Sequence, residues 1–103
     1  MAYNLIFSND FINELNKALD YISRNLDSPN SSKTLYNKIS NTVSLIKENP
    51  TLFPLYHNDK FIKHGFRYTV ISNYLLFYRI NESNKTVELL HFIYGSRNIT
   101  DMF

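Results

Sequence analysis

The 103-residue sequence contains no cysteine, no tryptophan, two glycines and three prolines. Without cysteine, the chain cannot form disulfides, thiolate zinc sites or a cysteine nucleophile. Two glycines are too few for the glycine-rich loops that bind phosphates. The longest apolar stretches, such as residues 74–78, reach about a quarter of the length of a membrane-spanning helix. The first residues lack the basic and apolar regions of a signal peptide, so we expect a cytoplasmic protein.

The residues that are present fit a single folded domain. Hydrophobic residues make up 44% of the chain and charged residues 19%, which is typical of a folded globular protein and not of a disordered one. Eight phenylalanines and eight tyrosines supply large side chains for a core. A chain of this length can bury roughly 65% of its unfolded surface. We therefore expect one domain covering residues 1–103.

A short strand and an amphipathic helix are predicted at the start of the chain. Residues 3–7 alternate as a strand does, and Ser8-Asn9-Asp10 then supplies capping and acidic residues for a helix start. The helix is predicted from Asn9 to Leu26, because apolar residues recur there at helical spacing. Its apolar stripe consists of Phe11, Leu15, Ala18, Leu19, Ile22 and Leu26.

A second helix is predicted after a short break. Residues 27–30 contain aspartate, serine, proline and asparagine, which together stop a helix. Ser31 or Ser32 is expected to cap the second helix, and Asn49-Pro50 ends it. Residues 51–63 show no sustained periodicity, so we expect a loop there.

The rest of the sequence changes to the alternation of β-strands. Strands are predicted at residues 66–71, 74–80 and 86–94, joined by Ser72-Asn73 and by the polar residues 81–85. The order is therefore β-α-α-β-β-β, which is an α+β fold. We expect an antiparallel sheet with a helical hairpin packed on one face, so that the other face is left for a partner.

Few residues of the chain are suited to catalysis. His57, His64 and His91 have no metal-ligand spacing, so neither a metal nor a cofactor is expected. No serine lies in a nucleophile elbow, and no paired carboxylates stand out. We interpret His91 as a hydrogen-bonded strand residue and Glu88 as a solvent-facing acid. Four strand tyrosines are interpreted as core and cross-strand residues rather than as a base-stacking surface: Tyr68, Tyr74, Tyr78 and Tyr94.

Positive charge is concentrated in the second half of the chain. Residues 1–51 carry five basic and five acidic side chains, whereas residues 52–103 carry six and four. We therefore expect one basic face on the half that contains the sheet. The candidates for contacts with a target are Lys60, Lys63, Arg67, Arg79 and Arg97. The two arginines at positions 67 and 97 are favoured, because a guanidinium binds phosphate or carboxylate groups at two points, while the lysines also fit solvated rim charges.

Three motifs in the second half resemble the RelE/ParE superfamily of bacterial toxins from type II toxin-antitoxin modules. They are GFRY at residues 65–68, NYLLFYRI at residues 73–80 and GSRN at residues 95–98. The motifs stand in the family's order behind a matching helical pair, so the resemblance covers nearly the whole chain. It implies a cytoplasmic toxin, of the kind linked to plasmid stabilisation, that a cognate antitoxin neutralises.

The two branches of this superfamily act differently. RelE-like members are ribosome-dependent mRNA interferases, in which basic, tyrosine or histidine side chains assist attack by a 2′-hydroxyl group. Thr69, Leu75 and Phe103 stand where such members place lysine, arginine and tyrosine, and this departure favours the ParE-like branch. ParE-like members inhibit DNA gyrase by binding and are not nucleases.

The resemblance therefore implies a gyrase inhibitor that is not an enzyme. The alternative is an mRNA endoribonuclease that uses Arg67 and Arg97 with His64 as the base, and a third interpretation is a toxin fold without activity. The implied partner is the antitoxin, in a hetero-oligomer that involves no membrane. Its contacts are expected on the helical hairpin and the neighbouring sheet surface. The candidate contact residues are Leu15, Leu19, Ile22, Tyr36 and Ile39.

Overall fold

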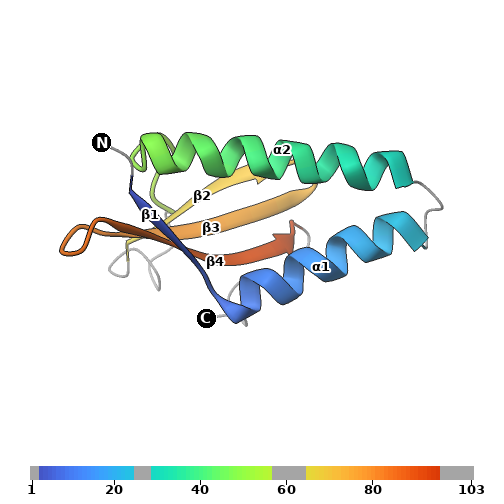
Figure 1. The fold of residues 1–103 in the computed structure, drawn as a ribbon, viewed down its shortest axis with the longest axis horizontal. Helices are drawn as coiled ribbons and strands as arrows, with labels where there is room; N and C mark the ends of the chain where they lie inside the picture. Colours follow the sequence, from blue (N-terminus) through green and yellow to red (C-terminus); the bar gives the residue numbers. More distant parts are fainter. Residues whose placement is uncertain (1–2, 25–28, 57–64, 96–103) are drawn as a thin grey trace.

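A computed structural model describes residues 3–24, 29–56 and 65–95. The helices and strands follow the predicted order β-α-α-β-β-β (Figure 1). They are β1 (Asn4–Phe7), α1 (Asn9–Arg24), α2 (Pro29–Glu48), β2 (Phe66–Ile71), β3 (Tyr74–Asn81) and β4 (Thr86–Tyr94). The predicted α+β class is therefore confirmed. Neither described helix is long and apolar enough to cross a membrane.

The four strands form one sheet in the order β1-β4-β3-β2. The pairs β2–β3 and β3–β4 are antiparallel, as predicted, but β1 lies parallel to β4, so the sheet is mixed and not purely antiparallel. The path of the chain explains this direction. The helical hairpin returns the chain to the end of the sheet where it began, and three alternating strands then give β4 the direction of β1 (Figure 1).

Ser8 fixes the start of α1 and joins it to β4. Its Oγ accepts a hydrogen bond from the Phe11 N–H at 2.9 Å, which is a helix cap, and donates one to the Leu90 carbonyl at 2.8 Å. The Ser8 N–H donates to the Leu89 carbonyl at 2.9 Å. One serine therefore supplies a hydrogen-bond acceptor for a backbone N–H in the first turn of α1 and continues the contact of β1 with β4.

The second helix begins earlier than the sequence predicted. It starts at Pro29, whereas a start after Ser31 or Ser32 was expected. Proline suits the first turn of a helix, because the N–H that it lacks would have no partner there. Ser32 is not a cap, since its Oγ donates to the Leu19 carbonyl of α1 at 3.1 Å and so ties the two helices together. The predicted end of α1 at Leu26 lies outside the described residues.

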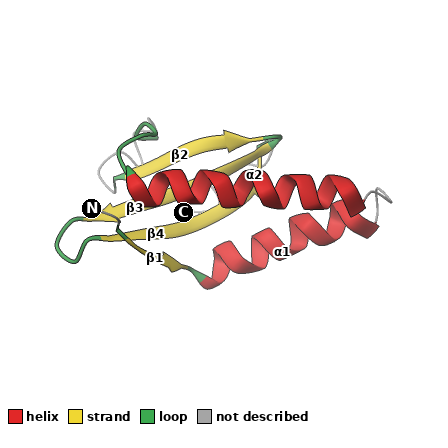
Figure 2. Cartoon of the chain, turned by 45° about the horizontal axis from the view of Figure 1, so that its top comes forward, coloured by secondary structure: helices red, strands yellow, loops and turns green. Residues whose placement is uncertain are grey.

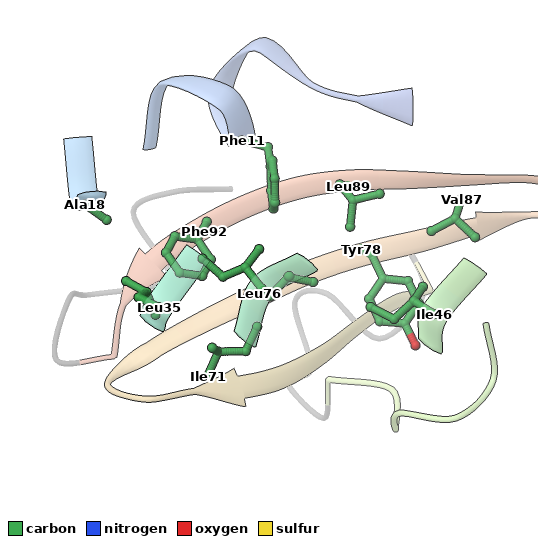
Figure 3. Packing of buried hydrophobic residues seen from close by; sticks show 11 residues of the cluster. Phe11, Ala18, Leu35, Ile46, Ile71, Leu76, Tyr78, Val87, Leu89 and Phe92 are labelled. Carbon is green, nitrogen blue, oxygen red and sulfur yellow. The ribbon is translucent and has the colours of Figure 1, made fainter. Parts of the chain in front are cut away.

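The helices cover one face of the sheet (Figures 1 and 2), and the core lies between them and that face. Its side chains come from α1, α2 and the strands and interlock in a single layer (Figure 3). Those with the largest buried volumes include Phe11, Ile46, Leu76, Tyr78, Leu89 and Phe92. Figure 3 places Tyr78 beside Ile46, and the Tyr78 hydroxyl donates to the Pro50 carbonyl at 2.6 Å.

The other face of the sheet is covered by an aromatic group instead of a helix. Tyr68 stacks on Phe77 across the β2–β3 pair, with 6.2 Å between ring centroids. Tyr56 meets both rings edge-on, at 5.3 Å and 5.2 Å. Phe77 is fully buried beneath them. The last described part of the predicted loop therefore packs on the sheet, where Leu55 also forms a bridge with Arg67.

Candidate binding groove

The two described arginines of the sheet lie on opposite faces. Strand register places Arg67 opposite Tyr78, on the face covered by the helices, and Arg79 opposite Phe66, on the other face. An Arg67 Nη donates to the Phe53 carbonyl at 2.8 Å. Arg79 forms an ion pair with Glu88 at 2.8 Å and lies over the Phe66 ring at 5.9 Å. The expectation of one basic face is therefore wrong for these two residues.

Glu88 also differs from its interpretation as a solvent-facing acid. Its side chain is 28% exposed and its carboxylate accepts the Arg79 Nε–H across the β3–β4 pair. Cross-strand neighbours of opposite charge stabilise a sheet locally. The sequence could not show this pairing, because it depends on the register of two strands separated by a turn.

The other predicted target or nuclease residues cannot be placed. Lys60, Lys63 and His64 fall within residues 57–64, and Arg97 and Phe103 fall within residues 96–103, all outside the described residues. Among the described residues, no group of three potential metal ligands is close enough to hold an ion. A nuclease constellation of Arg67, Arg97 and His64 therefore stays a prediction.

The predicted antitoxin contacts differ strongly in accessibility. Leu15, Leu19 and Ile22 are half-buried and pack against the core. Ile39 is 4% exposed and belongs to the core, so its side chain offers no surface to a partner. Tyr36, by contrast, is 53% exposed on α2.

A groove of about 1210 Å³ lies between the helical hairpin and one end of the sheet. Lys17 and Tyr21 contribute from α1, and Thr34 and Lys38 from α2. The β2–β3 turn and the last residues of β4 form the opposite side. This volume is larger than that of a typical small-molecule pocket. Sequence patterns did not predict the groove, because it forms only where two helices, a turn and two strands meet.

A carboxylate and a histidine are paired on the wall of this groove. His91 Nδ1 lies 3.1 Å from Glu14 Oε1, and the two side chains are only 12% and 15% exposed. The same Glu14 oxygen accepts the Phe92 N–H at 3.1 Å. The interpretation of His91 as a hydrogen-bonded strand residue is confirmed. The sequence pattern could have identified Glu14, because it is an acid inside the apolar stripe between Phe11 and Ala18.

Tyrosines from three elements gather at the same end of the groove. Tyr74 stacks on Phe92 with ring centroids 4.8 Å apart and meets Tyr94 edge-on at 5.7 Å. This contact confirms Tyr74 and Tyr94 as a cross-strand pair. Burial raises the pKa of the Tyr74 phenol, and the neighbouring hydroxyls of Tyr94 and Tyr21 raise it further. Tyr74 therefore keeps its proton near neutral pH and can act as a hydrogen-bond donor.

Solved structures share this arrangement of helices and strands. The chromosomal ParDE toxin-antitoxin system from P. aeruginosa matches with a TM-score of 0.71 and 13% identity, covering 90% of this chain and 96% of that one. The archaeal RelE-RelB complex from Pyrococcus horikoshii OT3 matches with a TM-score of 0.63 and 14% identity, covering 95% and 100%. The RelBE2 toxin-antitoxin complex from Mycobacterium tuberculosis matches with a TM-score of 0.55 and 14% identity, covering 91% and 99%. At these identities the likeness establishes the fold.

The family is established by the sequence itself. No curated protein matches the chain in sequence. A family model, however, matches residues 5–99, which include every helix and strand except the first residue of β1. Its description is the ParE toxin of the type II toxin-antitoxin system parDE. The chain therefore belongs to the ParE toxin family of type II toxin-antitoxin systems.

Proposed function

We propose that this ParE-family toxin inhibits DNA gyrase by binding to it and that an antitoxin neutralises the toxin by binding in turn. The match to the ParE family over residues 5–99 is the observation that carries the proposal. The toxin acts in the bacterial cytoplasm, where gyrase is found. Together with its antitoxin, it would also stabilise a plasmid that carries both genes.

The sheet face without helices supports a binding role. Register places Leu75 opposite Val70 on this face, and Val70 is 59% exposed. An apolar pair of this kind suits contact with a protein surface and offers nothing to a phosphate group. Arg79 lies on the same face, 41% exposed and held by Glu88. We propose that the target contact uses this face, with Arg79 as its described cation.

The proposal of an antitoxin partner also rests on membership of the ParE family. The relatives from P. aeruginosa and Pyrococcus horikoshii were solved as a toxin-antitoxin system and as a RelE-RelB complex. We propose that the present chain likewise forms a hetero-oligomer with its antitoxin. The exposed tyrosines Tyr21, Tyr36 and Tyr94 are suitable anchors, since tyrosine is enriched among residues that dominate binding energy.

A supercoiling assay tests the target. Purified toxin is incubated with DNA gyrase, relaxed plasmid and ATP, and the control contains toxin saturated with antitoxin. We expect supercoiling to stop at excess toxin and to return when antitoxin is added. Supercoiling that continues at excess toxin contradicts gyrase as the target.

An mRNA interferase is the second candidate, because the helix-free face carries the half-buried aromatic side chains Tyr56, Phe66 and Tyr68. Aromatic side chains on a sheet can stack on unpaired RNA bases. Cleavage of mRNA in a translating extract, together with unaffected gyrase, would establish this function. If neither gyrase inhibition nor cleavage is found while the antitoxin still binds, the chain is a toxin fold without activity.

A further inference from the structure

A small hollow of about 340 Å³ lies at the end of the sheet, beside the Val70–Leu75 pair of the helix-free face. It forms where the β2–β3 turn meets the last residues of β4. Its lining residues are Val70, residues 72–75, Tyr94 and Gly95. None of these described lining residues is charged, so the hollow suits an uncharged group.

A row of three apolar side chains leads across the sheet to this hollow. Strand register places Val70 opposite Leu75 and Leu75 opposite Ile93. Exposure rises along the row toward the edge of the sheet, because Ile93 is 2% exposed, Leu75 is half-buried and Val70 is 59% exposed. A partner that covers Val70 therefore extends an apolar layer that is already formed, and removes further apolar surface from water.

Gly95 keeps the hollow open. Its N–H donates to the Asn73 carbonyl at 2.8 Å, so the end of β4 is held close to the β2–β3 turn. A Cβ atom at position 95 would lie only 3.2 Å from the Asn73 oxygen. Any larger residue at this position would crowd the turn and reduce the space beside Val70. The close approach of these two backbone segments therefore requires glycine here.

A lysine reaches the rim of the hollow from the helical layer. Lys38 Nζ on α2 donates to the Ser72 Oγ at 3.5 Å, and Ser72 lines the hollow. Within residues 3–24, 29–56 and 65–95, no acidic side chain pairs with Lys38. Arg79, by contrast, is already held by Glu88. The rim therefore carries a positive charge that a carboxylate of a partner can complement.

We propose that the hollow receives one aliphatic or aromatic side chain of DNA gyrase and that an acidic residue beside it on gyrase pairs with Lys38. The volume lies near the lower end of the range for small-molecule pockets, roughly 300–1,000 Å³, so it suits one side chain and not a long segment. An apolar anchor in a pocket with a charged rim is the usual arrangement of the residues that dominate binding energy. The inference rests on the proposed function and adds which chemistry of the target the toxin recognises.

Substitutions of Val70 test the apolar anchor in the gyrase supercoiling assay. We expect Val70→Asp to raise the toxin concentration for half-inhibition by at least about tenfold, because it places a charge against the apolar side chain. Val70→Ile keeps an apolar branched side chain and should stay within about threefold. Leu45→Asp is the matched control, since Leu45 is 54% exposed on α2 and does not line the hollow. Thermal unfolding checks that each variant is folded. Undiminished inhibition by Val70→Asp, or an equal loss with Leu45→Asp, would overturn the inference.

Charge reversal at the rim is an independent test on an exposed residue. We expect Lys38→Glu to raise the half-inhibitory concentration by about fivefold at low salt, and this difference from the unmodified toxin should shrink as salt screens the charges. Lys38→Arg should inhibit like the unmodified toxin. Lys17→Glu is the control, because Lys17 lies on α1 and does not line the hollow. A loss that does not depend on salt, or an equal loss with Lys17→Glu, contradicts an acidic partner residue at Lys38.

The unmodified toxin separates this inference from the proposed function. If it does not inhibit gyrase at all, gyrase is not the target and the inference fails with the proposed function. If it inhibits and the Val70 and Lys38 variants inhibit equally well, only the inference is wrong. A second copy of the chain is the other possible occupant of the hollow. Gel filtration that shows a toxin dimer, dissociated by Val70→Asp, would assign the hollow to that copy and overturn the inference.

Discussion

Tyr78 places a polar hydroxyl at the base of the core, where it holds the chain after α2. The side chain is fully buried and its hydroxyl donates to the Pro50 carbonyl at 2.6 Å. Removing the hydroxyl leaves a buried carbonyl without its partner, which costs more than an average hydrogen bond. We therefore expect Tyr78→Phe to lower the free energy of unfolding by about 1–3 kcal/mol in urea denaturation. The exposed Tyr36→Phe is the control and should change the free energy of unfolding by less than about 0.5 kcal/mol.

The same residue makes stability depend on pH in the alkaline range. Burial raises the pKa of the Tyr78 phenol, and the Phe53 backbone and the Arg67 guanidinium lower it only in part. Folding therefore favours the protonated phenol, and this contribution is complete below the unfolded pKa of about 10 and is lost as pH rises through the folded pKa. We expect the stability difference between the unmodified chain and Tyr78→Phe to shrink above pH 10. Urea unfolding at pH 8 and above pH 10 measures it, and a constant difference would contradict this linkage.

Glu14 joins α1 to β4 through two hydrogen-bonding groups. Its carboxylate contacts His91 Nδ1 and the Phe92 N–H from a position that is 15% exposed. Hydrogen bonds to a charged acceptor are stronger than neutral ones, so Glu14→Ala should reduce the free energy of unfolding by about 2 kcal/mol. Glu14→Gln is the matched variant, because its amide oxygen can still accept the Phe92 N–H, and its loss should be smaller. Denaturant unfolding compares the two, and equal losses would show that the Phe92 bond contributes little.

The β2–β3 hairpin turn contains a strained residue that the sequence did not identify. Ser72 has φ of 56°, a left-handed backbone conformation that costs a residue with a Cβ atom about 1–2 kcal/mol. Glycine adopts this conformation without strain but loses more entropy on folding. We therefore expect Ser72→Gly to raise the free energy of unfolding by about 0.5 kcal/mol. Asn73 does not have a positive φ. Asn73→Gly should therefore destabilise the hairpin, because glycine relieves no strain there and loses more entropy on folding. Thermal unfolding of both variants measures the contrast, and two losses would show that Ser72 is unstrained.

Sequence patterns predict the elements of this fold better than they predict the pairing between them. The strands at residues 66–71 and 86–94 were predicted with the bounds they have, because alternation and turn residues are local signals. The parallel contact of β1 with β4 was not predicted, since it joins residues about 80 positions apart and depends on the helical hairpin between them. The start of α2 was misplaced because serine and proline both suit a helix start.

The same holds for the candidate site: residue types could be read from the sequence, but the contacts between distant residues could not. Arg67 and Arg79 were recognised as functional candidates from residue type, but their opposite faces follow from strand register. Glu14 was visible only as an acid within an apolar stripe, and its partners His91 and Phe92 are 77 and 78 residues away. The groove depends on how the two helices are positioned over the end of the sheet. No local sequence pattern encodes that position.

At the scale of the whole molecule, the layered fold separates the two surfaces that we propose for binding. Helices cover one face of the sheet (Figure 2), and residues of both helices line the groove. The opposite face, which we call the open face, carries Arg79 and the exposed Val70. If the target contacts the open face and the antitoxin binds on the helical side, the antitoxin does not cover the target's contact surface. It would then neutralise the toxin through the bulk of the complex, which keeps the target away. Variants on the open face should therefore affect the target and leave antitoxin binding unchanged.

Substitution of Arg79 tests whether the target and the antitoxin bind to separate surfaces. Its ion pair with Glu88 is partly exposed, so Arg79→Ala should lower the free energy of unfolding by no more than about 1 kcal/mol. Because Arg79 is the described cation of the open face, we expect Arg79→Ala to raise the toxin concentration needed for half-inhibition of gyrase by about tenfold, with antitoxin affinity unchanged. Arg24→Ala is the control, since Arg24 also pairs with an acid, Asp20, but lies on α1. If Arg24→Ala impaired inhibition as much as Arg79→Ala, the target would contact the helical layer, and the two surfaces would not be separate.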